Sequence, residues 1–581
     1  MTKRWAMAVC VLVLCSVTAS SADADKTAKQ KKAAPLKLQT RLRVPVEKGS
    51  ALFRTVNRTV EWSPKQTAII VCDMWDLHHC LNATRRGGEL VPRMNQVLTA
   101  ARKQGITIIH APSGCTTAYE NHPARQHAQN TPRSENLPKD IGTWCHVVPE
   151  ENKGVYPIDQ TDGGEDDDLF EHRQWAARLT AMGKDPRRPW TKQTDGLTIL
   201  DDDYISDNGE EIWSIMETRG IENVVLLGVH TNMCVLGRPF GLRQMAQNGK
   251  NVVLMRDMTD TMYNPAMKPF VSHFTGTDLI VEHIEKHVCP TITSTCLLGG
   301  KPFRFQNDKR PHLVIVIAER EYRTNESLPP FALAELGRDF KVSYVYGDPN
   351  DRNNLPGIEI LDEADIALIS VRRRVLPQAQ MDVIRRFVES GKPVLGIRTA
   401  SHALSIKDKP VPEGYAAWND FDANVIGGNY TGHHGAGPKV TITTADGAAP
   451  HAILKGVDLS SFVGNGSLYT SKPLRESTQH LLTGTVEGHE AEPIAWTNIR
   501  TDGGRTFYTS LGHIDDFKQP AFRRLLTNAV YGAAGLEVPA QRPEARRGGQ
   551  ECRSRWSPSP LKKKLPAAAA HPCNPHKNAY L

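Results

Sequence analysis

Short, fully apolar runs alternate with amphipathic stretches along most of the chain. The first such run, Ala68 to Val71, ends at Cys72 and Asp73, and Glu89 to Gln104 follows with apolar residues three and four positions apart. Runs of this kind are typical of parallel strands buried on both faces, and the spacing is typical of a helix that covers them. The pattern predicts βαβ units, in which a parallel sheet carries helices on both faces.

The alternation is interrupted once inside this first half of the chain. From Ala111 to about Gly196 the periodicity fades into residues rich in Pro, Asp, Arg and His. An irregular stretch of that length is more often a functional or lid-like insertion than a plain loop. Around it, we predict strands at 106–109, 197–200, 223–227 and 251–255, and helices at 208–219, 234–248 and 277–288.

A polar segment, Lys301 to Arg310, separates this pattern from a second one of the same kind. The second pattern predicts strands at 312–317, 341–346, 364–370 and 393–397, and helices at 330–339, 377–390 and 520–534. A chain of 581 residues is longer than one hydrophobic core usually supports. The predicted fold class is therefore α/β, with two doubly wound, mostly parallel-sheet domains in tandem at 61–300 and 311–538.

The two ends of the chain differ from the folded pattern. A basic start, an apolar run from Ala6 to Val17 and small residues up to Ala24 follow the pattern of a secretory signal peptide over residues 1–24. The apolar run is too short to cross a bilayer comfortably, which argues against an uncleaved membrane anchor. We therefore expect export, to the periplasm or the medium, with a linker at 25–60 and a disordered basic tail at 539–581.

Composition and charge narrow the class of partner. Hydrophobic residues make up 39% and charged residues 23%, as in a soluble globular protein, and much of the formal net charge of +7 lies toward the two ends. We therefore expect a small-molecule substrate, no nucleic acid, no stable membrane span after signal cleavage, and a chain that could form a homo-oligomer. Eleven cysteines leave nine after the two in the signal segment, and Cys289 with Cys296 is one short-range disulfide that an oxidising compartment allows.

The most informative stretch places a cysteine directly after a predicted strand and turn. Cys234 is predicted to begin a helix, where a thiol feels the positive end of the helix dipole and nearby unpaired amides. This setting is expected to lower the thiol pKa, and the same amides could hold an oxyanion. The alternative is a buried structural cysteine, because cysteine is among the most buried residue types.

The sequence Gly-Val-His-Thr-Asn-Met-Cys-Val around Cys234 resembles the cysteine motif of the isochorismatase-like hydrolases, which include the nicotinamidases. Asp73 matches the position of that family's catalytic aspartate, and the resemblance covers roughly residues 61 to 290. It implies a cis peptide bond between Val229 and His230, and an oxyanion site formed by the amides of His230 and Cys234. It also implies that Asp73 accepts the thiol proton and passes it to the leaving group, as a general acid and base does.

The chain departs from that family at its third catalytic residue. The family has a lysine at the end of the strand before the penultimate helix, and this position falls here on Asp201, Asp202 and Asp203. Lys192 lies nearby, but on the wrong side of the strand predicted at 197–200, so it is a weak substitute. The missing lysine supports an alternative in which the chain is a binding protein that has lost catalysis.

Potential metal ligands gather after the first strand and in the insertion. Nicotinamidases bind a metal near the active site through an aspartate and histidines, but their Asp-x-His motif is not matched in position here. We therefore predict no metal and no other cofactor, and interpret the cluster as solvated or substrate-contacting; a metal-dependent amidase is the lower-ranked alternative. The residues in question are Asp76, His78, Cys80, His110, His122 and His127.

The second domain resembles the ThuA-like proteins, relatives of class I glutamine amidotransferases that are linked to trehalose use. The stretches that carry this resemblance are 393–402 and 509–513. Where the amidotransferases have a cysteine nucleophile, this chain has Arg398, which stays protonated and only donates hydrogen bonds. The resemblance therefore implies no glutaminase activity. It suggests instead a carbohydrate or an anion as ligand of Arg398, His402 and His513, with His433 and His434 nearby in a glycine-rich loop.

These observations predict an exported cysteine hydrolase that acts on a small amide or a related substrate, with a ThuA-like accessory domain. The alternative is a non-catalytic protein that binds a small molecule or a carbohydrate and is built on two degenerate hydrolase folds.

Overall fold

The computed structural model describes residues 34–540, apart from 407–408, 436 and 449. The predicted signal peptide at 1–24 and nearly all of the predicted basic tail at 539–581 lie outside the described residues, so both stay predictions. Within the described part of the chain, no helix has the length and the apolar sequence that crossing a membrane requires.

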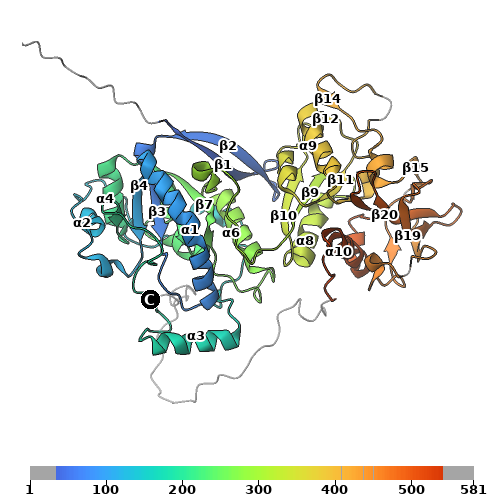
Figure 1. Ribbon diagram of the computed structural model, residues 1–581. Coiled ribbons are helices and arrows are strands. Elements are labelled where there is room, and N and C mark those ends of the chain that lie inside the picture. The colour runs from blue at the N-terminus through green and yellow to red at the C-terminus, as the bar shows by residue number, and fades with distance from the viewer. Residues whose placement is uncertain (1–33, 407–408, 436, 449, 541–581) are drawn as a thin grey trace, which may run out of the picture. The chain divides into compact units, whose positions relative to one another are not determined.

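The first domain is built on an eight-stranded sheet in the order β2-β1-β8-β7-β6-β3-β4-β5 (Figure 1). The neighbours from β8 to β5 pair in parallel, whereas β1 pairs antiparallel with β2 and with β8. The strands are β1 (Leu36–Pro45), β2 (Phe53–Trp62), β3 (Thr67–Cys72), β4 (Thr107–Ala111), β5 (Tyr204–Ile205), β6 (Asn223–Val229), β7 (Asn251–Asp260) and β8 (Thr291–Ile292).

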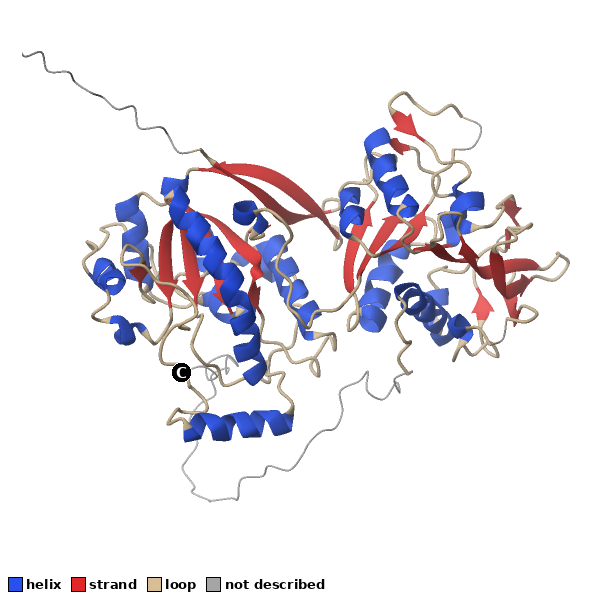
Figure 2. Ribbon diagram, in the orientation of Figure 1, coloured by secondary structure: helices blue, strands red, loops and turns tan. Residues whose placement is uncertain are grey.

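Helices cover both faces of this sheet (Figure 2). On one face, Leu90 and Met94 of α1 pack with Ile69 of β3 in one apolar cluster. On the other face, Ile212 of α4 and Ile280 of α6 belong to a second apolar cluster. The helices are α1 (Leu81–Gln104), α2 (Pro123–Gln129), α3 (Leu169–Ala181), α4 (Gly209–Arg219), α5 (Leu242–Gln247), α6 (His273–His287) and α7 (Thr295–Leu298).

Three local predictions for this domain are wrong. The linker predicted at 25–60 is wrong from residue 36 onward, because β1 and β2 pair along ten residues and bury Leu36 and Leu38. No strand forms at 197–200, and the edge strand β5 begins only at Tyr204. The helix predicted at 234–248 is interrupted between 238 and 241, where Pro239 cannot donate a helical backbone hydrogen bond.

The second domain has a nine-stranded sheet in the order β10-β9-β11-β13-β21-β20-β19-β16-β17. The first five pair in parallel and the last four antiparallel, so the sheet is mostly parallel only in its first half. The elements are β9 (His312–Ala318), α8 (Thr324–Leu336), β10 (Lys341–Tyr346), β11 (Ile366–Val371), β12 (Leu376–Pro377), α9 (Gln378–Glu389), β13 (Val394–Ile397), β14 (Tyr415–Ala416), β15 (Gly432–His433), β16 (Val440–Thr444), β17 (Val463–Gly464), β18 (Tyr469–Thr470), β19 (Thr478–Thr485), β20 (Glu492–Ile499), β21 (Arg505–Thr509) and α10 (Pro520–Ala534).

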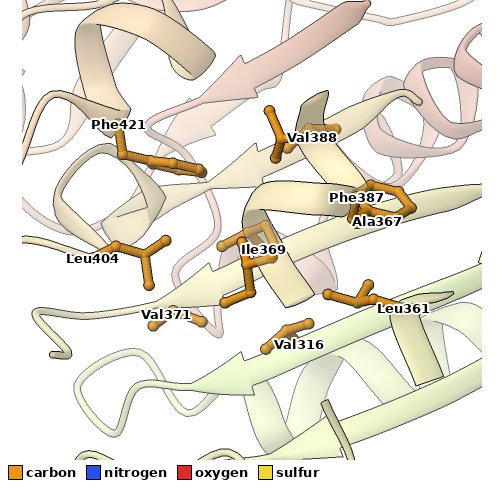
Figure 3. A pocket seen from close by; sticks show the side chains of 11 residues that line it. Val316, Leu361, Ala367, Ile369, Val371, Phe387, Val388, Leu404 and Phe421 are labelled. Carbon is orange, nitrogen blue, oxygen red and sulfur yellow. The ribbon is translucent and has the colours of Figure 1, made fainter. Parts of the chain in front are cut away.

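A small apolar cavity lies inside this second domain, between α9 and the sheet (Figure 3). Val316, Ile369, Phe387, Leu404 and Phe421 point into it, and every other residue that lines it is also apolar. A ligand site needs polar groups that fix the ligand's orientation. The cavity is therefore part of the hydrophobic core.

Candidate active site

The carboxyl ends of β3 and β6 bring the two main sequence-predicted residues to one edge of the first sheet. The two strands are parallel neighbours, with Cys72 opposite Gly228. Asp73 follows β3 directly, and Cys234 lies in the turn that follows β6. Gly228 permits this close pairing, because a Cβ atom there would lie 2.0 Å from the carbonyl oxygen of Cys72.

Cys234 lies in a single π-helical turn, η4 (Thr231–Val235), rather than at the start of a long helix. The peptide bond between Val229 and His230 is cis, at the position that the family resemblance implies. The carbonyl oxygen of His230 accepts hydrogen bonds from the amides of Met233 and Val235 in the same turn. The backbone amide of His230 donates to the Cys234 sulfur. At least one backbone amide is therefore directed at the thiol.

Asp73 is completely buried and forms an ion pair with Arg238, a residue that was not predicted from the sequence. One carboxylate oxygen accepts a hydrogen bond of 2.8 Å from the amide of Ser113. The other lies 3.1 Å from both Nε and Nη2 of Arg238. The guanidinium group of Arg238 also lies over the ring of Trp144, at 4.8 Å from its centroid. Arg238 is thus held from two sides and neutralises the carboxylate.

The pKa of the Cys234 thiol is raised, and the predicted lowering is wrong. Burial is the largest cause, and both the negative charge of Asp73 and a hydrogen bond to its carboxylate raise the pKa further. The charge of Arg238 and the amide of His230 lower it, but they do not outweigh burial. The thiol is therefore protonated at neutral pH, with the Asp73 carboxylate as the adjacent acceptor for its proton.

This raised pKa predicts slow alkylation of Cys234. The thiolate is the reacting species, so iodoacetamide should label Cys234 more slowly than free cysteine at neutral pH, with a rate that rises with pH. Asp73→Asn removes a negative charge that raises the pKa, so labelling at neutral pH should become faster. Mass spectrometry of the Cys234 peptide measures both rates. Labelling of the unaltered protein faster than free cysteine would contradict the raised pKa.

Lys192 and the acidic run do not lie where the missing family lysine would be needed. The ammonium group of Lys192 binds both carboxylate oxygens of Asp195 at 2.7 Å, and 42% of its side chain is exposed. The acidic run precedes β5 instead of ending a strand, and Asp203 is paired with Arg102 at 2.6 Å. Within the described residues, Arg238 is therefore the cation that pairs with Asp73.

The spacing of Arg238 from Cys234 could have predicted its place in the site. Arg238 follows Cys234 by four residues, a spacing that puts two side chains on the same face of a helix. The backbone confirms one such turn, because the amide of Arg238 donates to the carbonyl oxygen of Cys234 at 3.0 Å. A search for a cation one helical turn after the cysteine would have found it.

An aromatic wall lies beside the cis peptide bond; we use this name for Trp75, His78, His79 and Trp190. The two tryptophan rings stack at 4.6 Å, and the His78 ring lies 4.8 Å from that of His230. Burial lowers the pKa of His230 to about 3, although the charge of Asp260 acts in the opposite direction, and burial also lowers the pKa of His78. Both rings are therefore neutral at neutral pH, and they suit a planar, uncharged part of a ligand.

The structure does not bring the possible metal ligands of the sequence together. Asp76 binds Thr191, His110 lies between Gln193 and Asp203, the ring of His122 accepts a backbone amide of α2, and the His127 ring lies beside Tyr204. Within the described residues, the one group with suitable spacing is Cys80, Asp166 and Asp167.

That group already has partners in the protein. Asp166 is paired with Arg86 at 2.8 Å, and Asp167 accepts the amides of Leu81 and Asn82 at the start of α1. Cys80 and Asp167 therefore help to begin a helix, and the charge of Asp166 is balanced by a cation. The arrangement fits a helix start better than a metal site.

The second-domain candidates lie at the carboxyl end of β13 and near the end of β21. Arg398 is 2% exposed, lies between the rings of Tyr322 and Tyr469, and donates to the carbonyl oxygen of Ser467 at 3.0 Å. Its guanidinium group thus holds two loops, which leaves it poorly placed to contact a ligand. The ring of His402 stacks on Tyr430, and His513 accepts the backbone amide of Asp515.

Cysteines 289 and 296 are free thiols in the structure, so the short-range disulfide considered from the sequence does not form. The other cysteines between residues 34 and 540 are also free, namely Cys72, Cys80, Cys115, Cys145 and Cys234.

The first domain combines a mostly parallel sheet with a thiol, a carboxylate and a guanidinium group at the ends of adjacent strands, so it is an α/β domain with a candidate nucleophile at its strand ends. Family models match parts of both domains. The model of the isochorismatase domain matches residues 67–268, and the ThuA model, described as trehalose utilisation, matches residues 313–531. The chain therefore carries an isochorismatase domain followed by a ThuA domain.

Solved structures similar to the chain include members of both groups. A ThuA-like protein from Parabacteroides merdae is 17% identical and covers 41% of this chain and 94% of its own, with a TM-score of 0.30. A cysteine hydrolase from Pseudomonas syringae pv. phaseolicola is 16% identical and covers 40% of this chain and 90% of its own, with a TM-score of 0.24. An isochorismatase family protein from Burkholderia thailandensis is 13% identical, with coverages of 40% and 94% and a TM-score of 0.22. No curated protein sequence matches the chain.

Proposed function

We propose that the first domain is a cysteine hydrolase that acts on a small amide or a related substrate, with Cys234 as nucleophile. The observation that carries this proposal is the contact of the thiol with the buried Asp73 carboxylate, which Arg238 holds in place. Burying a carboxylate and a cation is costly. A cysteine that serves only packing needs neither group, so their presence beside Cys234 favours a nucleophile.

The reaction follows from the protonated state of the thiol. The Cys234 sulfur attacks the substrate carbonyl carbon while its proton passes to the Asp73 carboxylate. The new oxyanion accepts hydrogen bonds from the backbone amides of His230 and Cys234. When the carbon–nitrogen bond breaks, Asp73 returns the proton to the leaving amine, and a thioester remains on Cys234. Asp73 then takes a proton from a water molecule, whose oxygen attacks the thioester carbon. When the carbon–sulfur bond breaks, the carboxylic acid is released and Asp73 returns the proton to the Cys234 thiolate.

Arg238 is a positioning residue in this scheme. Its guanidinium group stays protonated, so it cannot serve as the base, and it acts by holding the Asp73 carboxylate at 3.1 Å. It also lowers the cost of a negative charge on either Asp73 or Cys234. A guanidinium group can therefore take over the electrostatic part of the role for which the family has a lysine.

We also propose that the protein is exported, because residues 1–24 have the sequence pattern of a secretory signal peptide. When the full chain is produced in a secretion-competent bacterial host, we expect the mature protein outside the cytoplasm with its N-terminus near residue 25. N-terminal sequencing and intact mass measure the cleavage. Retention of Met1 on protein that stays in the cytoplasm would contradict export, while a deletion of residues 2–24 should keep the protein inside the cell.

A further inference from the structure

The carboxyl ends of three neighbouring strands in the second sheet carry an unusual number of arginines. The strands β10, β9 and β11 are parallel neighbours, so their carboxyl ends lie at the same edge of the sheet. In open α/β sheets this edge is where ligands bind. We call the following residues, which come from the loops after these strands, the arginine cluster: Arg320, Arg352, Arg372, Arg373 and Arg374.

Most of the arginine cluster is not neutralised by acidic side chains. Within the described residues, the ion pair formed by the cluster is that of Arg372 with Glu321, at 2.7 Å. Arg320 and Arg374 donate instead to backbone carbonyl oxygens, those of Pro349 and Ala318. Arg352 likewise donates to a backbone carbonyl oxygen. Four guanidinium groups therefore share this edge without a carboxylate in ion-pair contact.

The electrostatic effect of this excess is visible at Arg374. Burial, followed by the positive charges of Arg352 and Arg320, lowers its pKa to about 10, although Asp351 and Glu319 act in the opposite direction. Like charges that lower each other's pKa repel, and an anion between them would remove that repulsion. The edge therefore has a positive potential that is suited to an anionic ligand.

Arg373 is the member of the cluster best placed to contact a ligand. Its backbone amide donates to the carbonyl oxygen of His402 at 3.0 Å, which fixes the residue next to the end of β13. Its φ angle is 45°, a conformation that is costly for a residue with a side chain and that recurs at ligand sites. Its side chain is half-buried, and no described acidic group forms an ion pair with it.

An aromatic shelf lies beside Arg373; we use this name for His402, Tyr430 and Tyr469. The rings of His402 and Tyr430 stack at 4.3 Å, and those of Tyr430 and Tyr469 lie 4.9 Å apart. Burial and then the charges of Arg373 and Arg372 lower the pKa of His402 to about 3, so its ring is neutral. Tyr430 is only half-buried, so its ring offers an apolar face to a ligand.

We propose that the arginine cluster and the aromatic shelf bind a small organic anion, a sugar-sized ring that carries a carboxylate or a phosphate. Guanidinium groups recognise both anions through paired hydrogen bonds, and Arg373 adjoins the shelf, because its backbone amide binds the carbonyl oxygen of His402. The ring of the ligand packs against Tyr430. This site belongs to the second domain alone and does not depend on the hydrolase activity proposed for the first domain.

Isothermal titration calorimetry of the full chain tests this proposal with four probes: glucuronate, glucose 6-phosphate, glucose and inorganic phosphate. We expect at least one anionic sugar to bind about tenfold or more tightly than both glucose and inorganic phosphate, which corresponds to about 1.4 kcal/mol. The two anionic sugars distinguish a carboxylate from a phosphate ligand. Failure of both anionic sugars to bind at millimolar concentration, or equal binding of glucose, would overturn the proposal.

Variants locate the binding to the proposed residues. Arg373→Gln and Tyr430→Ala should each weaken binding of the anionic sugar by about tenfold or more. The matched control is Arg386→Gln on α9, since Arg386 is exposed and paired with Asp362 away from the strand ends, and it should leave the affinity unchanged. Thermal unfolding of each variant verifies that the fold is retained. Unchanged affinity in both folded variants would place the ligand elsewhere and overturn the assignment.

Discussion

Replacing Cys234 with alanine is expected to abolish turnover in a panel of small amides and related esters and enol ethers. The loss should be at least about 10⁴-fold in kcat, because without the sulfur no covalent intermediate forms and only binding and the oxyanion amides remain. Release of ammonia or of the free acid measures the rate. Trapping the thioester from the unaltered protein by rapid acid quench, followed by mass spectrometry, would locate it on Cys234.

The matched control for this variant is Cys296→Ala. Cys296 lies on α7, is partly exposed and is a free thiol like the nucleophile, so its removal should leave turnover within about twofold. Residual turnover by Cys234→Ala at the rate of the control would show that the chemistry does not pass through this sulfur. If the unaltered protein cleaves no member of the panel, the domain is a binding module in which the thiol and carboxylate serve another purpose.

Replacing Arg238 with methionine is expected to give the second-largest loss, about 10²- to 10³-fold in kcat, comparable to the removal of one preorganised electrostatic group from an active site. Methionine retains much of the apolar contact with Trp144, but it cannot hold the Asp73 carboxylate. Arg238→Lys keeps a charge but loses the two-point contact with one oxygen, so it should recover only part of the activity. A pH–rate profile separates this role from a purely structural one, because removing the cation should displace the profile along the pH axis, whereas a loss of packing alone should lower the rate without displacing it.

Lys192→Ala is the matched control for Arg238→Met. Lys192 binds Asp195 and is 42% exposed, so its loss should change kcat by less than about twofold. The opposite result, a large loss in Lys192→Ala and a small one in Arg238→Met, would show that the lysine rather than the arginine serves Asp73 during turnover.

The central strands of both sheets were predictable because they are buried on both faces and therefore uniformly apolar. The run Ala68 to Val71 lies within β3, and the strand predicted at 312–317 lies within β9. The hairpin of β1 and β2 was missed because one of its faces is exposed, so half of its positions are polar and resemble a linker. The edge strand β5 has only two residues, too few for any periodicity to be recognised.

The candidate site was predictable where it depends on strand ends and not where it depends on burial. The apolar runs predicted that Asp73 and Cys234 each follow a strand, and the family resemblance paired the two residues, but the neighbouring position of the strands came only from the structure. The state of the thiol could not be predicted, because the sequence shows the helix-like turn but not how deeply it lies in the protein. Cys234 is 7% exposed, and the cost of charging a buried sulfur exceeds what a single turn of helix and Arg238 return.

In the second domain, too, the sequence could not predict which side chains lie close together in space. The arginine at the position of the amidotransferase cysteine excluded a nucleophile there from the sequence alone. The sequence could not show that Arg398 is enclosed by two tyrosine rings, nor that the arginines after β11 adjoin His402. Those relations join loops that are far apart along the chain, and no local pattern reports them.

The close pairing of Cys72 with Gly228 has a consequence for how this domain can evolve. Because no side chain fits at residue 228, the spacing between the nucleophile and its base is set by the hydrogen-bonded sheet itself. Trp190 of the aromatic wall, by contrast, is contributed by the long insertion between β4 and β5. The parts of the insertion that contact neither Asp73 nor Arg238 can therefore change in sequence and length, and with them the choice of substrate, while the spacing of Cys234 and Asp73 stays the same.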